Sequence, residues 1–290
     1  MLDRSSVFGV LIMLAVAALG AIDAVVVRLV SHDIHPVFMV FARSIFGLLA
    51  MMPWIMRYPG MLKTNRFGLH SLRATLKLMS LGALFVAMTG APLATVTTLG
   101  FMSPIFVMVG AWFVFREQPK TLRIAAAIFG FVGVIIVKGP SNSEFSYFLI
   151  LALVSALLTA TIQLILKYMG KSEGADTLVA WNLIVSVPIA LVPALWFWCE
   201  PTPFQWMLLA LQGANGAISQ LLVTKAFQLA DASLVAPVDF MRLPSVAVCA
   251  FLFFGEVANQ STWIGAALIF VALVLIAISS RKPSLVKAVE

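Results

Sequence analysis

The chain has 290 residues, of which 62% are hydrophobic and 11% are charged, and its net charge is +7. This composition leaves too little polar surface to cover a soluble globule, and the mean hydropathy of +1.05 is typical of a chain that lies mostly in lipid. It therefore excludes a soluble enzyme and argues against a nucleic-acid-binding domain, because no basic residues alternate with aromatic ones on a soluble face. It predicts an all-α integral membrane protein.

Ten apolar segments of about 20 residues follow one another, each long enough to cross a bilayer. The first is longer than the apolar region of a signal peptide and is followed by comparable segments, so we expect it to be a span. The connections are short and rich in proline and glycine, and none is large enough for a soluble domain. The predicted spans are 7–29, 36–56, 71–89, 93–115, 121–138, 146–167, 176–198, 206–228, 232–254 and 261–280.

The stretch 91–117 returns in diverged form at 230–256, with a constant shift of 139 positions. Nine of the 27 aligned pairs are identical, among them Phe101 with Phe240. Each copy carries proline inside an apolar segment. Kinked or interrupted spans at matching positions of two halves are typical of a transporter site.

The duplication divides the chain into two units, 7–138 and 146–280, with five predicted spans each. Because five is an odd number, the second unit must enter the membrane from the side opposite to the first. We therefore predict ten transmembrane helices arranged as two inverted five-helix repeats, with the substrate near the membrane midplane between them.

Lysine and arginine are distributed unevenly between the two sides of the predicted bundle. With the N-terminus in the cytoplasm, 14 of them, including Arg73, fall in inner segments, and only Arg28 and Lys138 fall in outer ones. The positive-inside rule then predicts a multi-pass protein of the bacterial inner membrane with both termini in the cytoplasm.

Other features resemble a known family. They are an arginine early in the second span, in the segment FARSIFG at 41–47, and fourth and ninth spans that end in Arg116-Glu117 and Gly255-Glu256. With two five-span units, the chain resembles the drug/metabolite transporter superfamily in its ten-span EamA-like branch, over nearly its whole length. The resemblance implies a transporter, since members export amino acids and their derivatives or import solutes such as riboflavin or S-adenosylmethionine. The second half departs from the first where Asn182 replaces Arg43.

Five ionisable side chains lie inside predicted spans, where each costs on the order of 3 kcal/mol or more unless it faces a partner or a watery cavity. They are Asp23, Arg43, Lys77, Asp239 and Arg242. Asp239 and Arg242 are three positions apart and share a helix face, so they can pair with one another. The other candidates for the lining of the substrate site are Phe101, Gln163, Trp181, Asn182, Asn215 and Gln220.

Structural roles remain open for these residues. Asp23 and Arg43 can form a fixed pair between helices, and Lys77 can extend toward the inner surface. The amides can join helices by hydrogen bonds, and the two aromatic residues can pack in the core or form an apolar wall of the site. Charged residues at span ends are expected to act as caps, gates or interfacial anchors, and they include Arg28, Glu117, Lys167 and Glu256.

The sequence lacks the motifs of several other functions. No GxxxxGK loop is present to bind ATP, and no HExxH or cysteine spacing indicates a metal site or a disulfide. We therefore expect neither a cofactor nor a metal. An intramembrane enzyme would need a nucleophile with a base or a metal cluster, and a scaffold would need no buried charges.

We expect transport to be coupled to protons, for which Asp23 and Asp239 are candidates, or driven by the solute gradient.

The five ionisable groups comprise three cations and two acids. Groups of both signs suit a zwitterion, and the additional cation suits a further carboxylate. We predict a secondary transporter of an amino acid or an amino-acid-derived zwitterionic or carboxylate metabolite that works by alternating access, and the family resemblance implies export. The alternative is an importer of a cofactor-type solute such as riboflavin or S-adenosylmethionine. The sequence does not indicate an oligomeric state.

Overall fold

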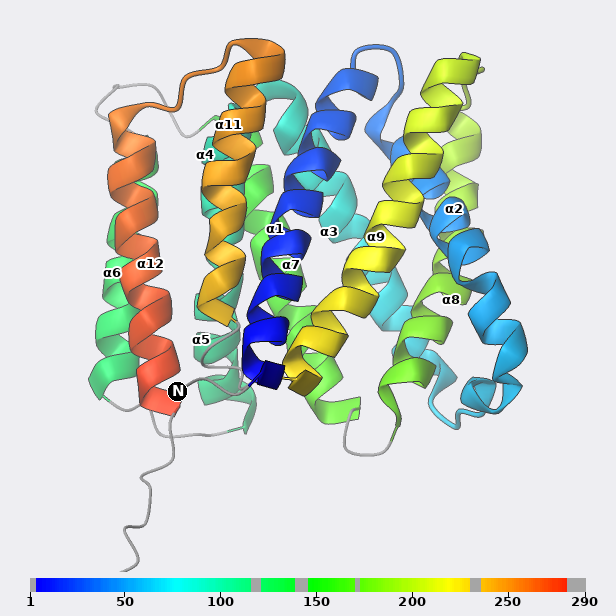
Figure 1. Ribbon diagram of the computed structural model, residues 1–290, viewed down its shortest axis with the longest axis horizontal. Coiled ribbons are helices and arrows are strands. Elements are labelled where there is room, and N and C mark those ends of the chain that lie inside the picture. The colour runs from blue at the N-terminus through cyan, green and yellow to red at the C-terminus, as the bar shows by residue number, and fades with distance from the viewer. Residues whose placement is uncertain (1–3, 116–120, 139–145, 170–172, 230–235, 281–290) are drawn as a thin grey trace, which may run out of the picture.

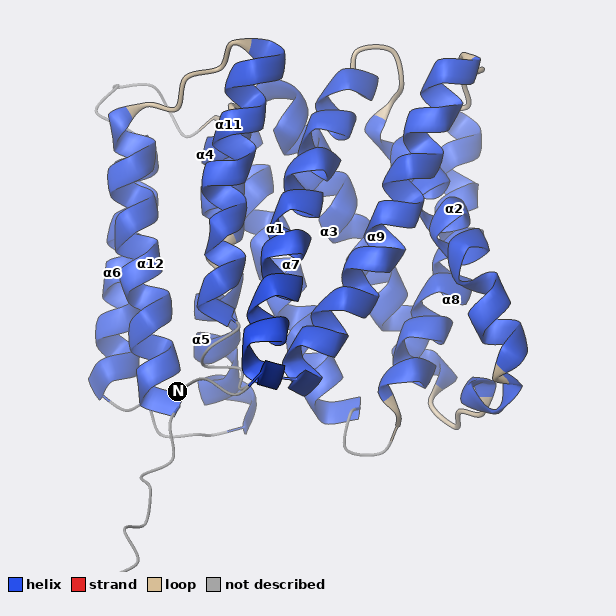
Figure 2. Ribbon diagram, in the orientation of Figure 1, coloured by secondary structure: helices blue, strands red, loops and turns tan. Residues whose placement is uncertain are grey.

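The computed structural model describes residues 4–115, 121–138, 146–169, 173–229 and 236–280. Within these ranges every regular element is helical, as Figure 2 shows. The all-α fold class predicted from the composition is therefore confirmed.

The helices divide into a first half, α1 to α6, and a second half, α7 to α12 (Figure 1). The first half consists of α1 (Arg4–Val30), α2 (Pro36–Arg57), the 3₁₀ helix η1 (Pro59–Leu62), α3 (Phe67–Gly90), α4 (Leu93–Gly100), α5 (Ser103–Phe115) and α6 (Thr121–Lys138). The second half consists of α7 (Tyr147–Met169), α8 (Ala175–Trp196), α9 (Pro203–Leu229), the 3₁₀ helix η2 (Ala236–Met241), α11 (Arg242–Phe254) and α12 (Gln260–Ser280). Among the described residues, six helices are long and apolar enough to cross a membrane, and shorter apolar stretches lie at 93–107, 127–137 and 260–275.

The fourth and ninth predicted spans are interrupted helices. In the fourth, α4 ends at Gly100 and α5 begins at Ser103; in the ninth, η2 ends at Met241 and α11 begins at Arg242. A proline lies in the first turn of the helix that follows each break, where its missing N–H removes no helical hydrogen bond. The sequence predicted a kink within each of these two spans, and the structure shows instead that regular α-helix is interrupted, at positions related by the shift of 139.

The two halves are inverted and interlocked. Their first helices, α1 and α7, run in opposite directions in Figure 1. The helices α4 and α5 pack against α7, whereas η2 and α11 pack against α1. Each interrupted span thus lies against the first helix of the other half, so both breaks are at the interface between the halves.

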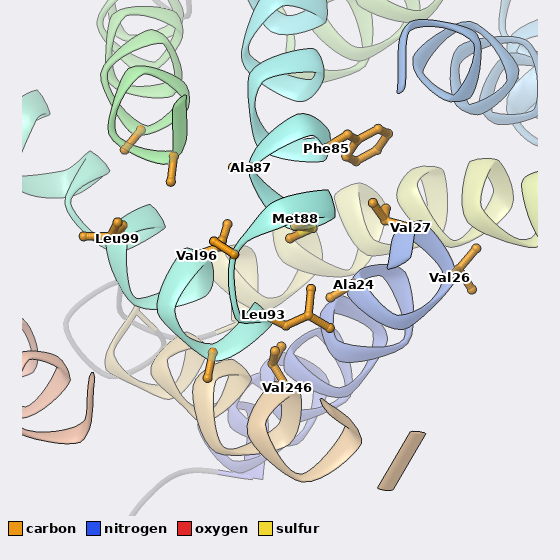
Figure 3. Close-up of a cluster of buried hydrophobic side chains, with 14 of the residues drawn as sticks. Ala24, Val26, Val27, Phe85, Ala87, Met88, Leu93, Val96, Leu99 and Val246 are labelled. Atoms are coloured by element: carbon orange, nitrogen blue, oxygen red, sulfur yellow. The ribbon is translucent and has the colours of Figure 1, made fainter. Parts of the chain in front are cut away.

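Apolar side chains fill this interface. Figure 3 shows the cluster in which Val27 of α1, Phe85 of α3, Leu93 of α4 and Val246 of α11 come together, each at most 1% exposed. Lipid is as apolar as these side chains, so helix association in a membrane depends on close packing.

Glycines bring two helices even closer at the edge of the bundle. A Cβ atom added at Gly133 of α6 would lie 2.9 Å from the carbonyl oxygen of Gly265 in α12. No larger side chain fits there without separating the two backbones, which explains the small residues in these helices.

The connections gather at two opposite ends of the bundle (Figure 1). At one end, Gln205 donates a hydrogen bond to Asp33 at 2.8 Å and joins the first turn of α9 to the α1–α2 connection. At the other end, the hydroxyl of Thr64 donates to Glu173 and joins the α2–α3 connection to the α7–α8 connection. The predicted outer and inner connections are therefore segregated from each other.

His35 and Cys199 lie in the end that the charge distribution assigns to the outside. The His35 ring stacks on Phe197 at 3.9 Å between centroids, and burial lowers the pKa of His35. A neutral imidazole can accept a hydrogen bond, and its Nδ1 accepts one from the N–H of Val37 at 3.3 Å, which caps α2. Burial also raises the pKa of the Cys199 thiol, which keeps it protonated and unreactive near neutral pH.

The side of the membrane to which each end belongs can be measured. In a variant without native cysteines, we expect Lys63→Cys to react with an impermeant thiol reagent only from the cytoplasm and Glu200→Cys only from outside, since both side chains are exposed in opposite connections. Labelling of intact cells and of inverted vesicles distinguishes the two sides. Labelling of both positions from the same side would contradict the ten-span topology.

Candidate functional site

The first of two arginine–aspartate pairs joins α1 to α2. Arg43 donates a hydrogen bond to Asp23 and forms a salt bridge with it, and their side chains are 18% and 20% exposed. The Arg43 guanidinium also lies over the Phe85 ring, 5.9 Å from its centroid. The interhelical pair that the sequence left open is therefore present, and each charge is neutralised by the other.

The α9 helix packs closely against this pair at Gly216. A Cβ atom added at Gly216 would lie 2.6 Å from Nη2 of Arg43, so only glycine leaves room for the guanidinium. One residue earlier, the amide of Asn215 donates to the carbonyl oxygen of Leu19 in α1 at 2.9 Å. The Oδ1 atom of Asn215 is buried and has no hydrogen-bond partner among the described residues, so it remains able to accept one.

The second pair lies at the break of the ninth span. Nη2 of Arg242 donates to Oδ1 of Asp239 at 2.6 Å, which confirms the predicted pairing, although Asp239 lies in η2 and Arg242 is the first residue of α11. Arg242 packs over Gly20 of α1, where an added Cβ atom would lie 2.8 Å from Nε. Gly20 is one helical turn from Asp23, so α1 carries the contacts of both pairs. The Arg242 side chain is 37% exposed, about twice as much as that of Arg43 at 18%.

The two helix breaks meet through aromatic rings. The centroids of Phe101 and Phe240, which occupy equivalent positions in the two halves, are 4.9 Å apart. Gln163 of α7 donates to the hydroxyl of Ser103, the first residue after the break in the fourth span, at 3.4 Å. The candidates Phe101 and Gln163 therefore lie at the interface of the halves, beside the second arginine–aspartate pair.

Three other candidates lie elsewhere in the bundle. The indole N–H of Trp181 donates to the carbonyl oxygen of Leu62 at 3.2 Å, and its ring is 5.9 Å from that of His70. These contacts place Trp181 at the end of the bundle assigned to the cytoplasm. Asn182 is buried in α8, and Gln220 is exposed on α9.

The count of charges in inner segments is wrong for Arg73, which lies inside the predicted span 71–89 and is buried in a helix. Arg73 lies within α3, is 3% exposed and donates to the carbonyl oxygen of Leu178 in α8. His70, also in α3, is fully buried, with Nε2 2.6 Å from Oε2 of Glu173. The spacing of His70, Arg73 and Lys77 places all three on one face of α3, a signal that the sequence already contained.

At the opposite end, Glu256 caps a helix and pairs with an arginine, as its position at a span end suggested. Its Oε2 accepts a hydrogen bond from the N–H of Leu93 in the first turn of α4 at 3.0 Å. Its Oε1 lies 2.9 Å from Nη1 of Arg28, which also donates to the carbonyl oxygen of Ala91. The residue equivalent to Glu256 in the first half, Glu117, lies outside the described residues.

The backbone at the end of α11 explains why a glycine precedes Glu256. Gly255 has a φ of +66°, a left-handed conformation that side chains other than glycine rarely adopt. The N–H of Gly255 donates to Phe251 and that of Glu256 to Ala250, a pattern that satisfies the last carbonyl groups of α11. This turn directs Glu256 away from its own helix and toward the first half.

Two polar contacts therefore join the halves, one at each end of the bundle. Arg28 of α1 meets Glu256 of the second half at one end, and His70 of α3 meets Glu173 of the second half at the other. Between them lie the two arginine–aspartate pairs and the helix breaks. Interrupted helices and buried charges between inverted halves define a multi-pass membrane transporter.

The comparisons with known proteins agree with this class. The model of the EamA-like transporter family matches residues 7–139 and 146–278. The chain belongs to this family, and it is a transporter and not an enzyme.

Several curated relatives align with most of the chain. An "S-adenosylmethionine uptake transporter" of Rickettsia prowazekii is 26% identical over 264 residues, which cover 91% of this chain and 90% of that protein. A "Riboflavin transporter" of Vibrio cholerae is 30% identical, with 74% and 73% covered. A "Pseudopaline exporter CntI" of Pseudomonas aeruginosa is 28% identical, with 81% and 84% covered.

One solved structure shares the fold. A protein crystal structure aligns with 97% of this chain and 100% of its own chain, at a TM-score of 0.66 and 14% identity. A likeness at this identity supports the arrangement of the helices only.

The glycines beside the two arginines generate a stability prediction. We expect Gly20→Ala and Gly216→Ala each to lower the free energy of unfolding by about 1–3 kcal/mol, because the new methyl group overlaps an arginine that is held by its aspartate. A Cβ atom at Gly82 of α3 would meet nothing within 4 Å, so Gly82→Ala is the matched control and should be neutral or slightly stabilising. Thermal unfolding of the purified variants in detergent measures the difference. Equal melting temperatures for all three would show that the arginines do not need these glycines.

Proposed function

We propose that the protein carries an amino-acid-derived zwitterionic or carboxylate metabolite across the bacterial inner membrane by alternating access. The observation that supports this most directly is the pairing of Arg43 with Asp23 and of Arg242 with Asp239 around α1, between the inverted halves. A solute with both an ammonium and a carboxylate group can exchange partners with such pairs without leaving a charge unpaired in lipid.

The second pair is the better candidate for direct contact with the solute. Arg242 is the more exposed arginine and lies at the break of its span, next to Phe101 and Phe240. In our proposal its guanidinium receives the solute carboxylate through paired hydrogen bonds, while Asp239 orients the arginine or receives the ammonium group. Arg43, Gln163 and the free acceptor of Asn215 complete the site.

Alternating access assigns a role to the polar contacts at the two ends of the bundle. The solute reaches the site from one side only if the halves separate there, so the contact of Arg28 with Glu256 must break on one side and that of His70 with Glu173 on the other. Both contacts are formed in this structure, so in our proposal one of them must break before a solute can enter from that side.

The relatives support this type of solute but differ in direction. S-adenosylmethionine carries an amino-acid end with an ammonium and a carboxylate group, and the named uptake transporter aligns with 91% of this chain. Export, which the family resemblance implied, is supported by the relative named as a pseudopaline exporter. Riboflavin import is the second candidate, because a relative named for riboflavin is 30% identical.

Transport by purified protein in lipid vesicles tests the function. We expect labelled S-adenosylmethionine or another zwitterionic amino-acid derivative to move in both directions, faster when unlabelled solute or a pH gradient is present across the membrane. ATP should have no effect, since the sequence contains no Walker loop. Vesicles without protein are the control. Movement of riboflavin alone would support the second candidate, and transport that requires ATP would contradict the secondary mechanism.

Substitution of the second pair tests the site. We expect Arg242→Gln and Asp239→Asn to transport at least tenfold more slowly, a loss of about 1.4 kcal/mol or more, because each removes one charge that holds the solute. Lys225→Gln, at an exposed position of α9, is the matched control and should transport as the wild type does. Wild-type rates in both variants would remove the pair from the substrate path, whereas failure of both to accumulate as folded protein would favour a structural role.

A further inference from the structure

Lys77 lies near the middle of its helix, far from either end. It lies ten residues after Phe67, the first residue of α3, which is about 15 Å at 1.5 Å per residue. It is 13 residues before Gly90, the last residue of the helix. The inner surface is therefore well beyond the reach of a lysine side chain, so Lys77 does not extend to it. Lys77 is partly exposed in this structure.

Lys77 differs from the other intramembrane charges in its neighbours. The charged groups that act on it electrostatically are Arg43 and Arg73, and both are positive. Arg43 is already held by Asp23, and Arg73 donates to a backbone carbonyl of α8. Among the described residues no carboxylate pairs with Lys77, so its three N–H donors are available.

An unpaired ammonium group in the middle of a membrane helix costs on the order of 3 kcal/mol. Two positive neighbours raise this cost, because like charges repel more strongly in a low-dielectric setting than in water. An arriving anion removes both penalties at once. A site that lacks one negative charge when empty is expected to bind a ligand that supplies it.

We infer that Lys77 receives a carboxylate of the solute in addition to the one that Arg242 receives. The transported metabolite is then an amino-acid derivative with a second acidic group, and Lys77 is the residue that selects for it. This inference rests on the proposed function, since it takes the contact at Arg242 as given.

The duplication supports a role for Lys77 in specificity. The position equivalent to Lys77 in the second half is Gly216, and the position equivalent to Arg43 is Asn182, so neither cation is part of the common frame of the repeats. Gly216 is the residue that leaves room for the Arg43 guanidinium. The first half thus supplies both cations, and the second half supplies the space that one of them occupies.

Glutamate and glutamine are suitable probes, because both are zwitterions and they differ in one carboxylate. We expect the wild type to be stabilised against heat by glutamate at lower concentrations than by glutamine, at constant ionic strength. Lys77→Gln should raise the apparent Kd for glutamate at least tenfold and leave that for glutamine within about twofold. Lys77→Arg should keep the preference, because it keeps the charge. Lys63→Gln, an exposed lysine in the α2–α3 connection, is the matched control and should behave as the wild type does.

Acetate separates failure of this inference from failure of the proposed function. If acetate stabilises the wild type but not Lys77→Gln, while neither amino acid binds, Lys77 is a carboxylate site and the zwitterionic solute is wrong. If the wild type and Lys77→Gln respond equally to glutamate and to acetate, or if neither probe stabilises the wild type, Lys77 is not a carboxylate receptor. If Lys77→Gln raises the apparent Kd for glutamate and for glutamine to the same extent, Lys77 shapes the site but does not bind the second carboxylate. The inference also fails in that case.

Discussion

Neutralisation of charge in a lipid environment is the constraint on which the rest of this structure depends. Asp23, Arg43, Asp239 and Arg242 lie among helices that are otherwise apolar, and each arginine is held by an aspartate within hydrogen-bonding distance. Such groups are expensive alone and tolerable in pairs. The helix α1 is built around this requirement, since one of its faces supplies Asp23 to the first pair and makes room at Gly20 for the second.

The repeats supply a symmetric frame in which the charges are not symmetric. Both interrupted spans break at equivalent positions, and each lies against the first helix of the other half. At the position of Arg242, however, the first half has Ser103, which meets Gln163 through a neutral hydrogen bond. In the proposed mechanism, the duplicated backbone allows the halves to move against each other. The residues that differ at equivalent positions of the two halves recognise the particular solute.

Local patterns made much of this architecture predictable. The repeat, the interrupted spans and the contact between Asp239 and Arg242 each follow from spacing along one segment, which sequence reveals directly. The contacts between distant segments could not be predicted in this way. The partner of Arg28 is 228 positions away at Glu256, and the orientation of that carboxylate depends on the left-handed turn at Gly255. Arg73 was counted with the loop charges although it lay inside a predicted span, and its hydrogen bond to the carbonyl oxygen of Leu178 crosses the helix interface.

The interruption before α11 is a point about which this helix can tilt. Arg242 lies next to the interruption, and α11 extends 13 residues, or about 20 Å, from there to the turn that carries Glu256. A tilt of about 10° at the interruption moves the far end by about 3.5 Å, which exceeds the 2.9 Å that now separates Glu256 from Arg28. In the proposed transport cycle, a tilt of α11 that accompanies solute binding at Arg242 would therefore separate Glu256 from Arg28 at the far end of this helix.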